Sequence, residues 1–261
     1  MWSILSGTII NAGTVAVGSL LGLTVGRRIS DRYRSITLQA LGLVTLTLGI
    51  DAAVLQFAET VKRFAPLVPN SGAYGARLAV VMIFSLLLGA ILGTAMRLHE
   101  RLESLGGWIH RRFSRSDGAT FAEGFLTASV IFCVGPLTLL GCLRNGRDGN
   151  PDYLYIKALL DGFCSTALAS ALGWGVFASV ATIIIFQGGL SLLAAWIAQP
   201  LDDLSISMMT VVGGMILLAT GLMILDIKKI PVANMLPGVF LPPLLIWLSR
   251  VISPGLLLPA G

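Results

Sequence analysis

Apolar residues run through this chain in long segments, and clusters of charged residues separate them. Each segment is close to the length of about 20 residues that a helix needs to cross a bilayer. Eight such segments fall near residues 4–26, 36–56, 76–96, 122–143, 157–177, 178–199, 206–226 and 233–252. The pattern predicts an all-α polytopic membrane protein of six to eight transmembrane helices, with residues 1–261 forming a single integral membrane domain.

Composition excludes a water-soluble fold. Of the 261 residues, 55% are hydrophobic and 12% are charged, whereas a soluble domain carries about a quarter charged residues. The net charge of +5 comes from basic residues grouped beside the apolar segments, an arrangement that sets membrane orientation. We therefore expect a lipid bilayer around the chain and no nucleic-acid partner.

The basic clusters predict the orientation of the chain. They follow the first, third and seventh segments, within residues 27–34, 97–115 and 228–229. Placing these clusters in the cytoplasm puts the N-terminus outside. No basic residue precedes the first segment, so we expect it to be retained as a span rather than cleaved as a signal peptide.

Residues 97–115 separate two halves of the chain with a different pattern. Leu98, Leu102 and Leu105 recur at helical spacing while arginines face elsewhere, so we expect an amphipathic helix lying at the membrane interface. The only histidines, His99 and His110, fall within it and are expected on its polar face.

Glycine and proline interrupt two of the apolar segments. Gly135-Pro136 lies within 122–143 and Gly188-Gly189 within 178–199, and a proline removes a helical hydrogen bond at membrane depth. Both segments are predicted to be broken or re-entrant, although a topology of eight full spans is also consistent. GPLTLLG is similar to GGLSLLA, and two further short similarities pair residues 19–25 with 170–176 and residues 40–49 with 212–221. In the re-entrant topology these two further pairs have opposite orientations, which suggests an inverted repeat of the kind found in secondary transporters.

Small residues mark faces for close helix packing. Gly18, Gly22 and Gly26 recur every four residues, as do Gly89 and Gly93, and such faces let helices approach closely. They indicate a compact bundle or a homo-oligomer. The three cysteines, at positions 133, 142 and 164, form no C-x-x-C pair and are expected to be buried thiols.

Polar residues within the apolar segments are the candidate chemistry. A charged aspartate in a span costs roughly 2.5–3.5 kcal/mol and usually faces a partner or an aqueous cavity. Asp161 follows Lys157 by one helical turn, so one interpretation is that the two residues form an ion pair at the membrane interface. The other interpretation is that Asp161 belongs to an ion or substrate path. This path would be formed by Asn11, Ser129, Gly135, Pro136, Thr138, Asp161, Ser165, Gln187, Gly188 and Ser191.

The oxygens in this set suit a hard monovalent cation or a proton. The spans contain no histidine or cysteine cluster for a metal, and the chain has no nucleotide-binding or hydrolase motif. We therefore expect no cofactor and no catalytic residues, and we do not expect an enzyme.

Five blocks of the chain resemble a known family. They are GTIINAGTVAVGSLLGLTVGRR, FAEGFLTASVIFCVGPLTLLGCLRNG, IKALLDGFCSTALASALGWGVFASV, FQGGLSLLA and GLMILDIKKIPVANMLPG. In content and order they resemble the YqgA/YdfK-type family of prokaryotic multi-pass membrane proteins, a domain of unknown function sometimes labelled a candidate sodium channel or pump. The resemblance implies the cytoplasmic (inner) membrane. Met223 departs from the Asn associated with the family at that position.

The resemblance also implies recurring motif positions without assigning them roles. These positions are Asn11, Gly135, Pro136, Lys157, Asp161, Gln187, Gly188, Asn234, Leu236 and Pro237. The leading hypothesis is a channel or transporter for a small cation, sodium or protons. The alternatives are a transporter of a small anion or metabolite, and a structural or regulatory membrane module without transport activity.

Overall fold

The structure is a computed structural model that describes residues 2–25, 31–68, 71–101, 104, 119–133, 136–198, 201–252 and 256–257. Within these ranges the chain is helical throughout its regular elements and contains no strand. The all-α class predicted from the apolar segments is confirmed.

Six helical stretches in the described ranges are long and apolar enough to cross a membrane. A seventh is added if the bent pair α6 (Ala119–Cys133) and α7 (Pro136–Asp148) forms one span. The six, as residue ranges, are Ile4–Thr24, Gln39–Leu67, Ser71–Ala95, Trp174–Trp196, Asp203–Ile224 and Val232–Ile252. The helix α8 (Asp152–Leu172), which carries Lys157 and Asp161, is not among them. The prediction of a polytopic membrane protein is confirmed.

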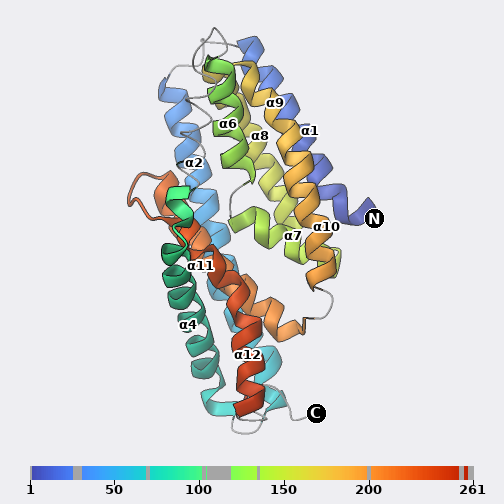
Figure 1. The fold of residues 1–261 in the computed structure, drawn as a ribbon, viewed down its shortest axis with the longest axis vertical. Helices are drawn as coiled ribbons and strands as arrows, with labels where there is room; N and C mark the ends of the chain where they lie inside the picture. The colour runs from blue at the N-terminus through green and yellow to red at the C-terminus, as the bar shows by residue number, and fades with distance from the viewer. Residues whose placement is uncertain are drawn as a thin grey trace. The chain divides into compact units, whose positions relative to one another are not determined.

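The chain divides into two compact units. Unit 1 comprises Met1–Leu41 and Glu100–Gln199, and unit 2 comprises Gly42–His99 and Pro200–Gly261. The boundary near the N-terminal end falls inside helix α2 (Asp31–Ile50). Figure 1 colours the elements by residue number, from blue at the N-terminus to red at the C-terminus.

Unit 1 is built on a close, parallel pair of helices, α1 (Trp2–Val25) and α8. A Cβ atom added to Gly18 would lie 2.2 Å from the carbonyl oxygen of Gly162, and one added to Gly22 would lie 2.3 Å from that of Thr166. Later residues of α1 thus meet later residues of α8, so the two helices run in the same direction. The predicted packing role of Gly18 and Gly22 is confirmed, whereas Gly26 lies outside the described residues.

This parallel pair corrects part of the repeat hypothesis. An inverted repeat needs opposite directions for residues 19–25 and 170–176, but residues 170–172 end α8, which runs parallel to α1, and residues 174–176 lie beyond the turn in α9. The second pair, 40–49 and 212–221, does run antiparallel, because Gly49 packs on Leu218 and Gly221 packs on Leu46. The second pair therefore has the opposite directions that an inverted repeat needs, and the first pair does not.

The fourth predicted segment is bent where the sequence places Gly135-Pro136. The axes of its two halves, Thr127–Cys133 and Leu137–Asp148, differ by 46°. The bend agrees with the predicted interruption and fits either a broken span or a re-entrant segment. Pro136 is the first residue of α7, where its missing N–H leaves no helical bond unmade, and Gly135 lies outside the described residues.

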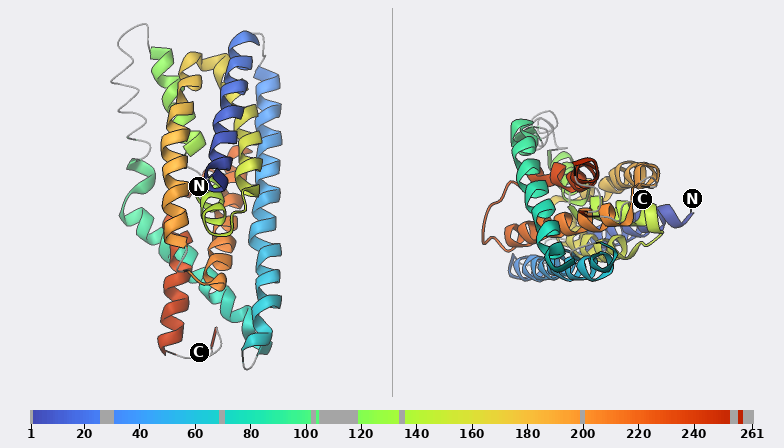
Figure 2. Two further views of the ribbon diagram at one scale, coloured as in Figure 1. Left: turned by 90° about the vertical axis from the view of Figure 1, so that its right-hand side faces the viewer. Right: turned by 90° about the horizontal axis from the view of Figure 1, so that it is seen from below.

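The sixth predicted segment differs from the expectation of a break at Gly188-Gly189. Helix α9 (Trp174–Thr182), the π-helical turn η5 (Ile183–Gln187) and α10 (Gly188–Ala198) form one continuous rod, as Figure 2 shows. Glycine retains its N–H, so these residues continue the helical hydrogen bonding that a proline would interrupt.

The chain instead reverses at Gly173, which has a φ of +74° between α8 and α9. This left-handed backbone is readily adopted by glycine. The boundary between the fifth and sixth segments, predicted at residues 177–178, therefore lies at Gly173.

Unit 2 is organised around α11 (Asp203–Ile224), the candidate span with the largest buried share, 61%. The π-helical turn η2 (Asp51–Leu55) meets it closely, because a Cβ added to Gly214 would lie 2.4 Å from the backbone nitrogen of Ala53. The remaining elements are α3 (Gln56–Phe64), η3 (Ala65–Leu67), η4 (Ser71–Ala73), α4 (Tyr74–Ala95), η6 (Val232–Phe240) and α12 (Leu241–Ile252).

The second glycine face packs inside unit 2. Gly89 and Gly93 of α4 lie against η6, where added Cβ atoms would come within 2.3 Å of Gly238 and 2.0 Å of Asn234. This contact confirms the packing role of both glycines. Most of the predicted interfacial helix over 97–115 lies outside the described residues, so it stays a prediction.

Candidate functional site

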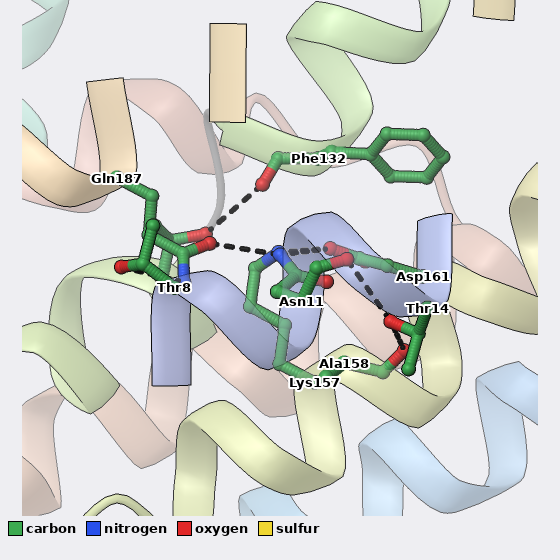
Figure 3. Close-up of polar contacts among 9 residues, drawn as sticks. Thr8, Asn11, Thr14, Phe132, Lys157, Ala158, Asp161 and Gln187 are labelled. Atoms are coloured by element: carbon green, nitrogen blue, oxygen red, sulfur yellow. Dashed lines mark hydrogen bonds and ion pairs between the residues drawn. The ribbon is translucent and has the colours of Figure 1, made fainter. Parts of the chain in front are cut away.

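A cluster of buried polar side chains lies in the interior of unit 1, where four elements meet. The close approach of α1 to α8 brings Asn11 beside Asp161, while η5 and α10 add Gln187 and Ser191 (Figure 3). Asn11, Gln187 and Ser191 are fully buried, and Asp161 is 7% exposed. Four residues predicted as a path from their polarity alone are therefore brought together by the fold.

Asn11 is the centre of this cluster. Its amide nitrogen donates to Asp161 Oδ2 at 3.0 Å and to Gln187 Oε1 at 2.8 Å. One side chain of α1 thus joins a carboxylate of α8 to an amide of η5. Beneath it, Thr14 donates to the carbonyl oxygen of Ala158 at 2.7 Å, which ties the two parallel helices together one turn later.

Asp161 also forms an ion pair with Lys157, one turn earlier on the same helix. The side chains of Lys157 and Asp161 are 5% and 11% exposed. The predicted pairing is confirmed, but the pair is buried in the unit rather than lying at an exposed interface. A buried pair of this kind requires further hydrogen bonds to offset the loss of hydration, and Asn11 supplies one.

A second branch of hydrogen bonds extends from Gln187. Its amide nitrogen donates to Thr8 Oγ1 at 3.4 Å, and the Thr8 hydroxyl lies 3.4 Å from that of Ser191. Ser191 in turn donates to the thiol sulfur of Cys142 on α7 at 3.2 Å. The cluster therefore reaches the C-terminal half of the bent segment, and Gln187 connects the two branches.

One oxygen of the cluster has no partner. Asn11 Oδ1 is buried and accepts no hydrogen bond, although a buried acceptor without a partner costs about 1–3 kcal/mol. This orphaned acceptor belongs to the residue that already holds Asp161 and Gln187. A cation would be stabilised by an acceptor in this position.

Three other predicted path residues form hydrogen bonds outside this cluster. Ser129 donates to Thr182 Oγ1 at 3.0 Å, Thr138 to the carbonyl of Phe132 at 3.4 Å, and Ser165 to the carbonyl of Gly162 at 2.8 Å. These bonds make Ser129 and Ser165 part of helix packing around the cluster. Gly188 lies beside the methyl group of Thr8, 3.6 Å from where its Cβ would be.

Three contributors were absent from the predicted path. The sequence predicts Lys157 only as a partner of Asp161 and Cys142 only as a buried thiol, and Thr8 is not among the predicted residues. The i,i+4 spacing is a sequence signal that identifies Lys157. No signal in the sequence connects Cys142 to Ser191, because that contact depends on how α7 packs against α10.

The cluster is rich in oxygen acceptors and poor in soft ligands. Within the described ranges, no group of three or more His, Cys, Asp or Glu residues could hold a metal ion. All three cysteines are buried, as predicted, and none forms a disulfide bond. The arrangement suits binding of a hard monovalent cation or a proton, which needs only a carboxylate and neutral oxygens.

Comparisons with known proteins agree with the resemblance seen in the sequence blocks. The family model described as "Protein of unknown function (DUF554)" matches residues 6–247. The uncharacterized membrane protein YdfK of Bacillus subtilis is 33% identical over 92% of this chain and 95% of its own length. The uncharacterized protein YqgA of Escherichia coli is 30% identical over 90% and 93%. No solved structure matches the chain.

Proposed function

The chain belongs to the DUF554 family of proteins of unknown function, and from this premise we propose that it is a small-cation transporter for sodium or protons. The proposed location is the cytoplasmic membrane of a prokaryote, with the N-terminus outside. The proposed binding site is the cluster of Asn11, Asp161 and Gln187. The proposal assigns the chain no enzymatic activity.

The observation that carries the proposal is the orphaned Asn11 Oδ1 next to a buried carboxylate. Asp161 supplies the negative charge, and Asn11 Oδ1 and Gln187 Oε1 supply neutral oxygens. Hard cations favour carboxylate and amide carbonyl ligands. An unpartnered acceptor among such groups is costly without a ligand and is stabilised when a cation binds.

The Lys157 ammonium group competes with an arriving cation for the Asp161 carboxylate. This group neutralises Asp161, so an arriving sodium ion or proton takes over that role. Lys157 then moves away from the carboxylate, so the cluster gains one positive charge, which its neutral oxygens must stabilise. Burial of the pair favours a carrier, which binds its ion in an occluded site, over an open channel.

The test is ion flux into proteoliposomes containing the purified chain, with sodium, potassium and proton gradients applied separately. Wild type is expected to show selective flux above empty vesicles. Asp161→Asn is expected to lower it at least tenfold, because the neutral amide removes the charge that binds the cation. The matched control is Asp152→Asn on the same helix, where the residue is exposed and flux should be unchanged.

A binding measurement keeps this test decisive if Asp161→Asn folds poorly. Sodium should raise the thermal midpoint of the wild type relative to choline at equal ionic strength, because a ligand of the folded state stabilises it. Folded wild type with neither selective flux nor this shift would overturn the proposal. In that case the hydrogen-bonded ion pair and the close glycine contacts would favour a structural module, proposed to act as a homo-oligomer.

A further inference from the structure

We propose that unit 2 binds one anionic phospholipid in the cavity between α4 and α12, with the lipid phosphate at Arg77. The cavity has a volume of about 350 Å³, within the range of roughly 300–1,000 Å³ typical of small-ligand sites. Its walls include Arg77, Val81, Phe84, Leu245, Leu248 and Ile252.

The walls of the cavity follow one face of each helix. Arg77, Val81 and Phe84 lie about one turn apart on α4, while Leu245, Leu248 and Ile252 do so on α12. At 1.5 Å per residue, Arg77 and Phe84 are separated by about 10 Å along α4. The cavity is therefore an elongated apolar slot between two helices, a shape that fits an acyl chain.

The cavity is open to the surroundings of the helices. Phe84 is 52% exposed and Leu248 is 42% exposed, in spans that a bilayer surrounds. Apolar walls offer water no hydrogen bonds, so the surrounding hydrocarbon fills such a slot. The occupant of an apolar slot in a membrane protein is therefore a lipid chain.

Arg77 gives this slot its charge preference. It lies in the first turn of α4, at the end of the candidate span Ser71–Ala95, where a lipid headgroup would lie. Its guanidinium donates to the carbonyl of Leu256 at 3.1 Å, which places it beside the leucines that line the cavity. An arginine at the interfacial end of an apolar slot complements a phosphate, because it forms charge-assisted hydrogen bonds with it.

Two hydrogen bonds fix the interfacial end of the slot. Tyr74, fully buried, donates to the carbonyl of Leu257 at 2.9 Å, beside the bond from Arg77 to Leu256. These two bonds fix Leu256 and Leu257 against α4. Both leucines also line the cavity, so the site is built before a lipid arrives.

The test uses native mass spectrometry of the full chain in detergent, titrated separately with phosphatidylglycerol, phosphatidylcholine and oleate. Wild type is expected to bind one phosphatidylglycerol about fivefold more tightly than phosphatidylcholine, the effect of about one basic contact. Arg77→Gln should remove this preference. Leu248→Trp should remove the binding event, because the larger side chain occupies the slot.

Arg63→Gln is the matched control, since Arg63 pairs with Asp203 and does not line the cavity. Equal binding of the two phospholipids by wild type, or equal weakening by Arg63→Gln and Arg77→Gln, would overturn the proposal. Oleate binding as tightly as phosphatidylglycerol would also overturn it, because the site would then hold a free fatty acid.

Crosslinking of wild type by phosphatidylglycerol with a photoactivatable acyl chain provides a readout independent of the variants. It should label the peptides containing Phe84 and Leu245, and labelling confined to other helices would contradict the assignment. Neither result depends on cation flux, since the cavity lies in unit 2 and the proposed cation site in unit 1.

Discussion

Units 1 and 2 are both bundles of apolar helices, but they bury different kinds of polar group. In unit 1, Asn11, Asp161 and Gln187 bond to one another across three elements. In unit 2, buried hydroxyls such as those of Thr60 and Thr210 turn back to a carbonyl of their own helix. A hydroxyl that bonds to its own helix makes its hydrogen bond without any other element. A network between helices forms only when the fold brings those helices together.

The two units also differ in how far their ion pairs are exposed to solvent. The described ion pairs of unit 2, Arg63–Asp203 and Arg250–Asp202, have side chains 35–62% exposed. Unit 1 instead buries Lys157 with Asp161. Because burying charge costs free energy that apolar residues would not cost, the contrast supports placing the proposed cation site in unit 1.

The largest expected effect comes from breaking the buried pair of unit 1. Asp161→Asn should lower the free energy of unfolding by about 3–5 kcal/mol, because it leaves the Lys157 ammonium buried without its counter-charge. The double variant Lys157→Met/Asp161→Leu should recover most of this loss. Equilibrium unfolding in mixed detergent micelles measures both, and a double variant as unstable as the single one would contradict this explanation.

A smaller effect should appear where glycines hold helices together, and it should be similar in the two units. Gly18→Ala and Gly93→Ala place a Cβ within 2.2 Å and 2.0 Å of a carbonyl oxygen, so each should destabilise by about 1–3 kcal/mol. Gly13→Ala is the control on the same helix as Gly18, because nothing lies within 4 Å of its added Cβ. Thermal unfolding separates them, and equal losses at positions 13 and 18 would rule out close packing as the cause.

The smallest effect should come from the exposed pair of unit 2. Arg63→Gln should change the free energy of unfolding by about 0–1 kcal/mol, because water and salt already screen Arg63 and Asp203. The same unfolding assay, repeated at low and high potassium chloride, should show any difference shrinking with salt. A loss comparable to that of Asp161→Asn would remove the contrast between the units.

The helices were predictable from the sequence because membrane spans depend on local composition. Runs of about 20 apolar residues leave few alternatives to a helix in a bilayer. The turn at Gly173 and the continuous helix through Gly188-Gly189 were not predictable in this way. A glycine permits both a turn and a helix, so the packing of neighbouring helices decides between them.

The polar residues of the candidate site were predictable from the sequence, but the hydrogen bonds between them were not. Asn11, Asp161 and Gln187 were identifiable because polar groups are rare in the spans. The contact of Cys142 with Ser191 required the fold, since residues 49 positions apart meet only through the packing of α7 on α10. The fold also places Asp51 at the start of the π-helical turn η2, within the candidate span Gln39–Leu67.

The spacing of Lys157 and Asp161 also has a consequence for biogenesis. A single charge at the centre of a membrane helix costs roughly 2.5–3.5 kcal/mol, and α8 is not among the candidate spans. Because Lys157 and Asp161 lie one turn apart on the same helix, they can neutralise each other before α8 packs against α1. Helix α8 therefore does not have to wait for another element to supply a counter-charge, and Asn11 and Gln187 can find their partners after the spans are in place.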